Sequence, residues 1–135
     1  MASKPVLTLE DAKRIAVAAQ AEALRNDWHV TIAIADDGGH LLYLERNHDT
    51  QFGSVKTAIK KAHAAVAFQR PTKVSEDAVT GGRLIHLALP GVIPAEGGLP
   101  LMLDGIIVGG LGISGVRAPQ DGQIAAAGAA ALVKN

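Results

Sequence analysis

The sequence contains no cysteine, and aromatic residues make up only 3% of its 135 residues. The lack of cysteine excludes disulfides, thiolate nucleophiles and zinc–thiolate sites, so any chemistry must use oxygen and nitrogen groups. Hydrophobic residues nevertheless reach 48% of the chain. Because so few are aromatic, the core must consist of alanine, valine, isoleucine and leucine, and we expect closely spaced helices.

Net charge and long apolar runs are also missing. Lysines and arginines (13) balance aspartates and glutamates (13), which leaves no long-range field to attract nucleic acid or an anionic membrane. No apolar run spans a bilayer without charges or glycines, and residues 1–9 lack the apolar core of a signal peptide. We therefore expect a cytoplasmic location, and the length is typical of a single domain covering residues 1–135.

Hydrophobic periodicity predicts both helices and strands. Helices are expected over residues 9–25, 52–69, 75–81 and 120–133, and extended segments over residues 30–35, 41–46, 101–103 and 106–114. Thr8 and Asp11 resemble a capping box at the first helix, and residues 90–100 are expected to form a loop. Hairpins between helices favour an α/β fold of the α+β type, with an antiparallel sheet of about five strands and helices packed on it.

The segment Gly110–Gly115 formally matches the dinucleotide motif G-x-G-x-x-G. That motif requires a helix to open at its end, whereas here a segment ending in Pro119 intervenes. Read as a strand, the segment places Gly110 and Gly112 on one face, which is nearly bare backbone. Either the alanine-rich last helix, with Gly128 at its centre, approaches this face closely, or a flat ligand or another subunit lies on it.

Five motifs in combination resemble the GlcG/HbpS family, which includes the C-terminal domain of PduO. They are Ala33–Leu41, Gly97-Gly98-Leu99-Pro100, Asp104-Gly105, Gly112-Ile113-Ser114-Gly115 and Asp121–Ala125. The resemblance covers nearly the whole chain. It implies a two-layer α/β sandwich with an antiparallel sheet that assembles into dimers or larger homo-oligomers. It also implies haem binding between subunits in some members, and an accessory role in the catabolism of small organic acids or aromatics.

One departure from the family pattern concerns the stretch after the second extended segment. The family commonly has Arg-Met-Asp there, whereas this chain reads Arg46-Asn47-His48, with histidine where the acid is usual. Lys61 and Ala62 fall at the family's Lys-Ala pair, so the histidine is a substitution and not a shift. The first helix carries no histidine, so a haem ligand placed there in some relatives has no counterpart.

His48 and Glu96 are the candidate catalytic residues. His48 follows a strand, and its ring can serve as a base or a ligand that the neighbouring Asp49 carboxylate orients. Glu96 precedes two glycines whose backbone N–H groups can approach a ligand. The alternative for both is a polar residue of an exposed loop. The candidate ligand-binding residues are Arg46, Asp49, Lys61, Gly97 and Gly98.

The remaining polar residues have less definite assignments. Arg46 and Lys61 can hold a carboxylate or a haem propionate, or can form ion pairs on the surface or between subunits. Asp121 is expected to stabilise the start of the last helix. His40 and His63 are expected to be exposed, and His29 and His86 stay open. No pair of histidines has the spacing of a recognised metal motif, so no metal site is assigned.

Three functions remain in competition. The first is a small-ligand-binding accessory protein of the GlcG type, with haem as a candidate cofactor in a pocket near a subunit interface. The second is an enzyme for a small organic acid, with His48 and Glu96 in acid–base roles and Arg46 holding the carboxylate. The third is a structural or regulatory homo-oligomer without chemistry. The expected partners are a second copy and a small molecule, with no nucleic acid and no membrane.

Overall fold

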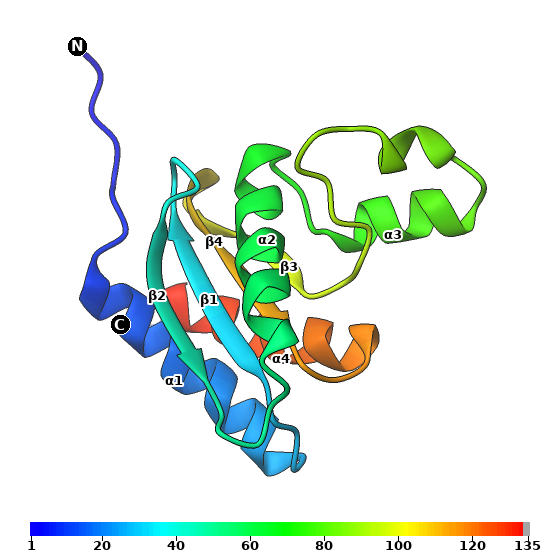
Figure 1. The fold of residues 1–135 in the computed structure, drawn as a ribbon. Coiled ribbons are helices and arrows are strands. Elements are labelled where there is room, and N and C mark those ends of the chain that lie inside the picture. Colours follow the sequence, from blue (N-terminus) through cyan, green and yellow to red (C-terminus); the bar gives the residue numbers. More distant parts are fainter. Residues whose placement is uncertain (134–135) are drawn as a thin grey trace.

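The structure, a computed structural model, describes residues 1–133. Four helices, four strands and two short 3-10 helices follow one another along this part of the chain (Figure 1). In order they are α1 (Leu9–Arg25), β1 (Thr31–Asp36), β2 (Leu41–Arg46), α2 (Gly53–Ala67), α3 (Lys73–Thr80), η1 (Leu84–Leu87), β3 (Gly98–Leu103), β4 (Ile106–Ser114), α4 (Ala118–Ala130) and η2 (Ala131–Val133). None of the helices in this range is long and apolar enough to cross a membrane.

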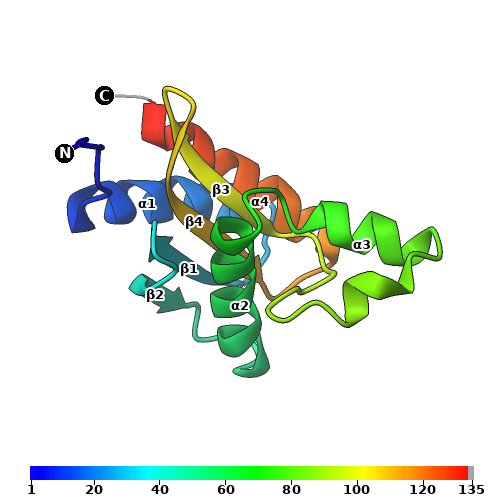
Figure 2. The ribbon, with the colours of Figure 1, turned by 90° about the horizontal axis from the view of Figure 1, so that it is seen from above.

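The strands form one sheet with the order β2-β1-β4-β3, and every neighbouring pair is antiparallel. The predicted α+β class and antiparallel sheet are therefore confirmed, with four strands where about five were expected. Strand β3 starts at Gly98, inside the segment expected to be a loop, because it pairs with β4 from Gly98 opposite Gly112 onward. Helix α2 lies on one face of the sheet and α1 and α4 on the other (Figure 2), so the sheet has a helix layer on each side, where the resemblance implied two layers in all.

Local sequence signals set the start of α1. The Thr8 hydroxyl accepts the backbone N–H of Asp11 at 3.1 Å, and the Asp11 carboxylate accepts the backbone N–H of Thr8 at 3.0 Å. This capping box satisfies two N–H groups that have no partner within the helix. The predicted capping box and the predicted bounds of the first helix are both confirmed.

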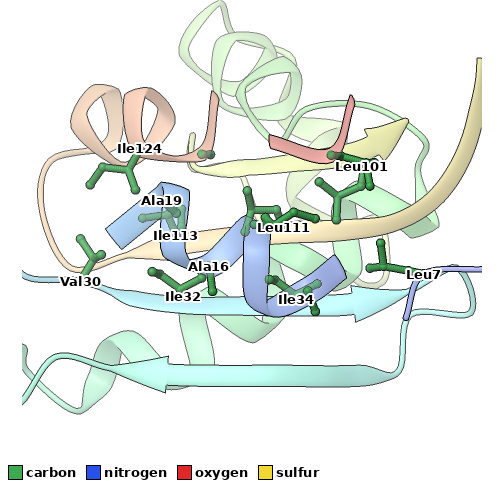
Figure 3. Close-up of a cluster of buried hydrophobic side chains, with 14 of the residues drawn as sticks. Leu7, Ala16, Ala19, Val30, Ile32, Ile34, Leu101, Leu111, Ile113 and Ile124 are labelled. Atoms are coloured by element: carbon green, nitrogen blue, oxygen red, sulfur yellow. The ribbon is translucent and has the colours of Figure 1, made fainter. Parts of the chain in front are cut away.

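The larger core lies between the sheet and the helices α1 and α4. Ile32 and Ile34 of β1, together with Leu111 and Ile113 of β4, point toward these helices and are fully buried (Figure 3). Alanines on α1 allow α4 to come close, since a Cβ added at Gly128 would lie 3.0 Å from the Cβ of Ala19. The buried residues of this core are alanine, valine, isoleucine and leucine, as the composition predicted.

The other face of β4 is where the bare strip of glycines lies. A Cβ added at Gly110 would meet the carbonyl oxygen of Ala62, and one added at Gly112 would meet the carbonyl oxygen of Ala58. Both carbonyls belong to α2, so α2 packs against the glycine strip and the last helix does not. The expectation that the last helix packs on the glycine face was therefore wrong. Side chains alternate along a strand, so Leu111 and Ile113 point toward α4 and the glycines face α2.

We predict that Gly112→Ala destabilises the protein strongly. The added methyl group must displace the α2 backbone, and overpacking of this kind costs roughly 1–3 kcal/mol or more. Gly53→Ala is the matched control, because a Cβ at Gly53 meets nothing within 4 Å. Urea denaturation of both variants measures the difference. Equal midpoints for Gly112→Ala and wild type would show that α2 does not rest on this strip.

Candidate functional site

The predicted site residues divide between the two edges of the sheet. Arg46, His48 and Asp49 lie at the end of β2, and Glu96, Gly97 and Gly98 lie at the start of β3. Both groups lie at the same end of the sheet, but β2 and β3 are the outermost strands of the order β2-β1-β4-β3. Three strand spacings separate the two edges by about 14 Å. The structure therefore does not bring His48 and Glu96 into one pocket.

The group at the end of β2 lies on an exposed turn. The His48 side chain is 89% exposed, and its Nε2 is 3.5 Å from the Asp49 carboxylate. The Arg46 guanidinium donates to the backbone carbonyl of Thr50 at 2.7 Å and so closes the turn. These side chains form no enclosed wall around a ligand.

Lys61, by contrast, is buried and paired. Only 3% of its side chain is exposed. Its ammonium donates to the Asp121 carboxylate at 3.0 Å and to the backbone carbonyl of Ile113 at 2.9 Å. The other carboxylate oxygen of Asp121 accepts the backbone N–H of Val116 at 3.2 Å. This buried ion pair connects α2, the end of β4 and the first turn of α4. Asp121 lies at the start of the last helix, and its carboxylate is engaged by Lys61 and by the Val116 N–H.

The two glycines at the start of β3 make room for this ion pair. A Cβ at Gly97 would lie 2.8 Å from the Lys61 ammonium, and one at Gly98 would lie 2.5 Å from the Lys61 carbonyl oxygen. The Glu96 carboxylate lies against Gly122, the fifth residue of α4. Lys61, Glu96, Gly97 and Gly98 are thus brought together, around the start of α4.

A second feature is the surface of η1, on the part of the chain that projects from the sheet with α3 (Figure 2). Leu84, Ile85 and Leu87 are 64%, 58% and 61% exposed. Between them, the Nδ1 atom of His86 is 3.2 Å from the hydroxyl of Ser75, which α3 holds in a buried position. We call residues 83–87 the η1 patch. The sequence did not assign a role to His86, because its partner Ser75 belongs to another helix and the contact cannot be read from local sequence.

A third feature is a hollow between the β1–β2 turn, α2 and the segment before β3. Its volume is about 240 Å³, and its lining residues are Gly39, Ile59, Lys60, His63, Gly91 and Val92. Sequence reasoning placed His63 on an exposed helical face and assigned no hollow there. Three segments distant in sequence form it, so no local signal marks it.

Comparison with known proteins identifies the family. The family model described as "Haem degrading protein HbpS-like" matches residues 7–130. The chain belongs to this HbpS-like family. GlcG of Escherichia coli (strain K12) is 42% identical over 114 residues, which cover 84% of this chain and 85% of GlcG. The resemblance seen in the motifs is therefore confirmed.

Two solved HbpS-like structures share the fold. The crystal structure of HbpS superposes with a TM-score of 0.86 at 31% identity and covers 96% of this chain and 92% of HbpS. The crystal structure of a PduOC:heme complex superposes with a TM-score of 0.83 at 35% identity and covers 94% of this chain and 95% of PduOC. The second of these relatives was solved with haem bound.

The pKa of Asp121 gives the ion pair a defined pH dependence. Burial raises this pKa to about 6 from an ordinary value of 3.8, while the Lys61 ammonium and the Val116 N–H oppose the rise. Between these two pH values the folded chain retains a proton that the unfolded chain has released. The contribution of Asp121 to stability is therefore complete below about pH 4 and is lost as the pH rises through about 6.

We predict that Asp121→Asn gains stability relative to wild type as the pH rises from 4 to 7. The relative gain is about 3 kcal/mol for a pKa raised from 3.8 to about 6, because one pKa unit corresponds to about 1.4 kcal/mol. Urea denaturation across this pH range measures it. In Asp11→Asn, the comparison variant, the difference from wild type should stay nearly constant from pH 4 to 7, because hydrogen bonds from Thr8 lower the pKa of Asp11 below 3.8 and its titration lies below this range. A difference between Asp121→Asn and wild type that does not vary with pH would contradict the assignment.

Proposed function

We propose that this protein is a haem-binding accessory protein of the GlcG type, which serves the catabolism of small organic acids or aromatics. The observation that carries the proposal is the η1 patch, where an imidazole with one ring nitrogen already engaged lies among exposed apolar side chains. A patch of this kind on a protein surface marks an interaction site. The solved PduOC:heme complex supports haem as the ligand.

The residues of the patch fit the chemistry of haem. A histidine that ligates a metal usually hydrogen-bonds through its other ring nitrogen, which fixes the ring and its tautomer. The contact of His86 Nδ1 with the Ser75 hydroxyl meets this requirement and leaves Nε2 free to face an iron. Leu84, Ile85 and Leu87 offer apolar surface to the porphyrin, and the exposed Arg83 guanidinium can hold a propionate. When bound there, haem would supply an iron centre with open or exchangeable coordination.

The patch covers one side of a ligand only. A porphyrin has two apolar faces, and a single exposed patch can bury one of them. We therefore propose that a second copy of the chain covers the other face, which gives a homo-oligomer with haem at the interface. The exposure of three large aliphatic side chains in a segment of four residues supports this arrangement.

An accessory role accords better with the geometry than an enzyme that uses His48 and Glu96 together. General acid–base catalysis needs both groups within hydrogen-bonding reach of one substrate. Here the two groups lie next to opposite edge strands, His48 after β2 and Glu96 before β3, and three strand spacings separate these strands by about 14 Å. The Glu96 carboxylate also lies against α4 rather than toward His48.

We predict that the protein binds haemin saturably and that His86 is required. A titration followed at the Soret band should give a shifted band for wild type, and His86→Ala should abolish the shift or weaken binding strongly. Ser75→Ala should weaken binding by about 10–100-fold, the effect typical of a lost outer hydrogen bond to a ligand.

His48→Ala is the control, because it removes an exposed histidine that lies outside the η1 patch. It should bind haemin as wild type does. Absence of any saturable Soret shift in wild type would remove haem as the ligand. Normal binding by His86→Ala together with loss in His48→Ala would move the site to the β2 turn.

A further inference from the structure

The hollow lined by Lys60 and His63 has the size of a small-molecule site. Its volume is about 240 Å³, which equals roughly eight water molecules at ~30 Å³ each. Pockets for drug-sized ligands start near ~300 Å³, and a porphyrin exceeds this space. The hollow therefore suits an occupant smaller than haem.

Two glycines in left-handed conformations border this space. Gly39 has φ = +83° and Gly91 has φ = +84°, a region that glycine adopts at little cost. A Cβ at Gly39 would lie 2.7 Å from Cδ2 of His63, so the absence of a side chain there lets the imidazole lie directly against the turn. Ile59 and Val92 supply the apolar walls.

The polar side chains that line the hollow are those of a lysine and a histidine. Lys60 and His63 lie three residues apart on α2, a spacing that puts them on one side of the helix. Within residues 1–133, neither side chain has a hydrogen-bond or ion-pair partner.

The two carboxylates of the facing turn are already engaged. Asp36 accepts the N–H groups of Gly38 and His40, both at 2.9 Å, and lies 3.2 Å from Nδ1 of His40. Asp37 forms an ion pair with Lys4. An anion that enters the hollow therefore meets an unpaired ammonium and an imidazole beside apolar walls.

We propose that this hollow binds a small organic carboxylate with a compact apolar body. The carboxylate accepts hydrogen bonds from the Lys60 ammonium and the His63 ring, and the apolar body lies between Ile59 and Val92 over the backbone of Gly39. This site is separate from the η1 patch, shares no residue with it, and does not depend on haem.

Benzoate is the probe, because it joins one carboxylate to a flat apolar ring. A titration of the haem-free protein with sodium benzoate at constant ionic strength, followed by ¹H–¹⁵N NMR, should give saturable shifts at Gly39, Ile59, His63 and Gly91. Lys60→Ala should weaken binding by about tenfold or more, because a hydrogen bond to a charged group contributes roughly 1.5–3 kcal/mol. His63→Ala should weaken it as well.

Lys56→Ala is the matched control, since Lys56 is an exposed lysine of the same helix that does not line the hollow. It should bind benzoate with unchanged affinity. Benzylammonium, with a similar ring and the opposite charge, should produce no saturable shifts at these residues.

Three results would overturn the proposal. They are non-saturable shifts with benzoate, equal weakening by Lys60→Ala and Lys56→Ala, and equal binding of benzylammonium. Because no haemin is present in this titration, its failure leaves the haem proposal untouched, and failure of haemin binding leaves this site untouched.

Discussion

The close contact between α2 and the bare backbone of β4 is the constraint on which the rest of the structure depends. Gly110 and Gly112 leave no side chain between the strand and the carbonyl oxygens of α2, so the helix axis and its rotation are fixed against the sheet. Lys61 then points inward, and its ammonium donates a hydrogen bond to the carboxylate of Asp121 at the start of α4. Lys60 and His63, on the outer side of the same helix, face the β1–β2 turn and border the hollow. One helix thus supplies both the lysine of the internal ion pair and a wall of the hollow.

Local sequence patterns predicted the elements of this fold well and their mutual placement less well. The first helix, its capping box and the β1–β2 hairpin follow from periodicity and turn residues alone. Strand β3 was partly missed because Gly98-Leu99-Pro100 has the composition of a loop and becomes a strand through pairing with β4. The glycine strip was recognised, but its partner helix was not, since alternation defines two faces without saying which helix covers each.

The candidate site shows the same limit. Residue type and position in the motif singled out His48, whose ring is exposed on a turn. They gave no assignment for His86. The feature that distinguishes His86 is its contact with Ser75, eleven residues away on another helix. Lys61 pairs with Asp121 across sixty residues of sequence, so a cation expected to hold a ligand is engaged inside the protein. Contacts over such separations leave no trace in local composition.

The central functional claim is that the imidazole of His86 holds a haem iron on the η1 patch. Anomalous diffraction at the iron absorption edge, from crystals of the protein grown with haemin, tests it most directly. The account predicts an iron peak within coordination distance of the Nε2 atom of His86, with the porphyrin lying against Leu84 and Leu87. An iron peak at any other residue, with the η1 patch free of haem, would contradict it.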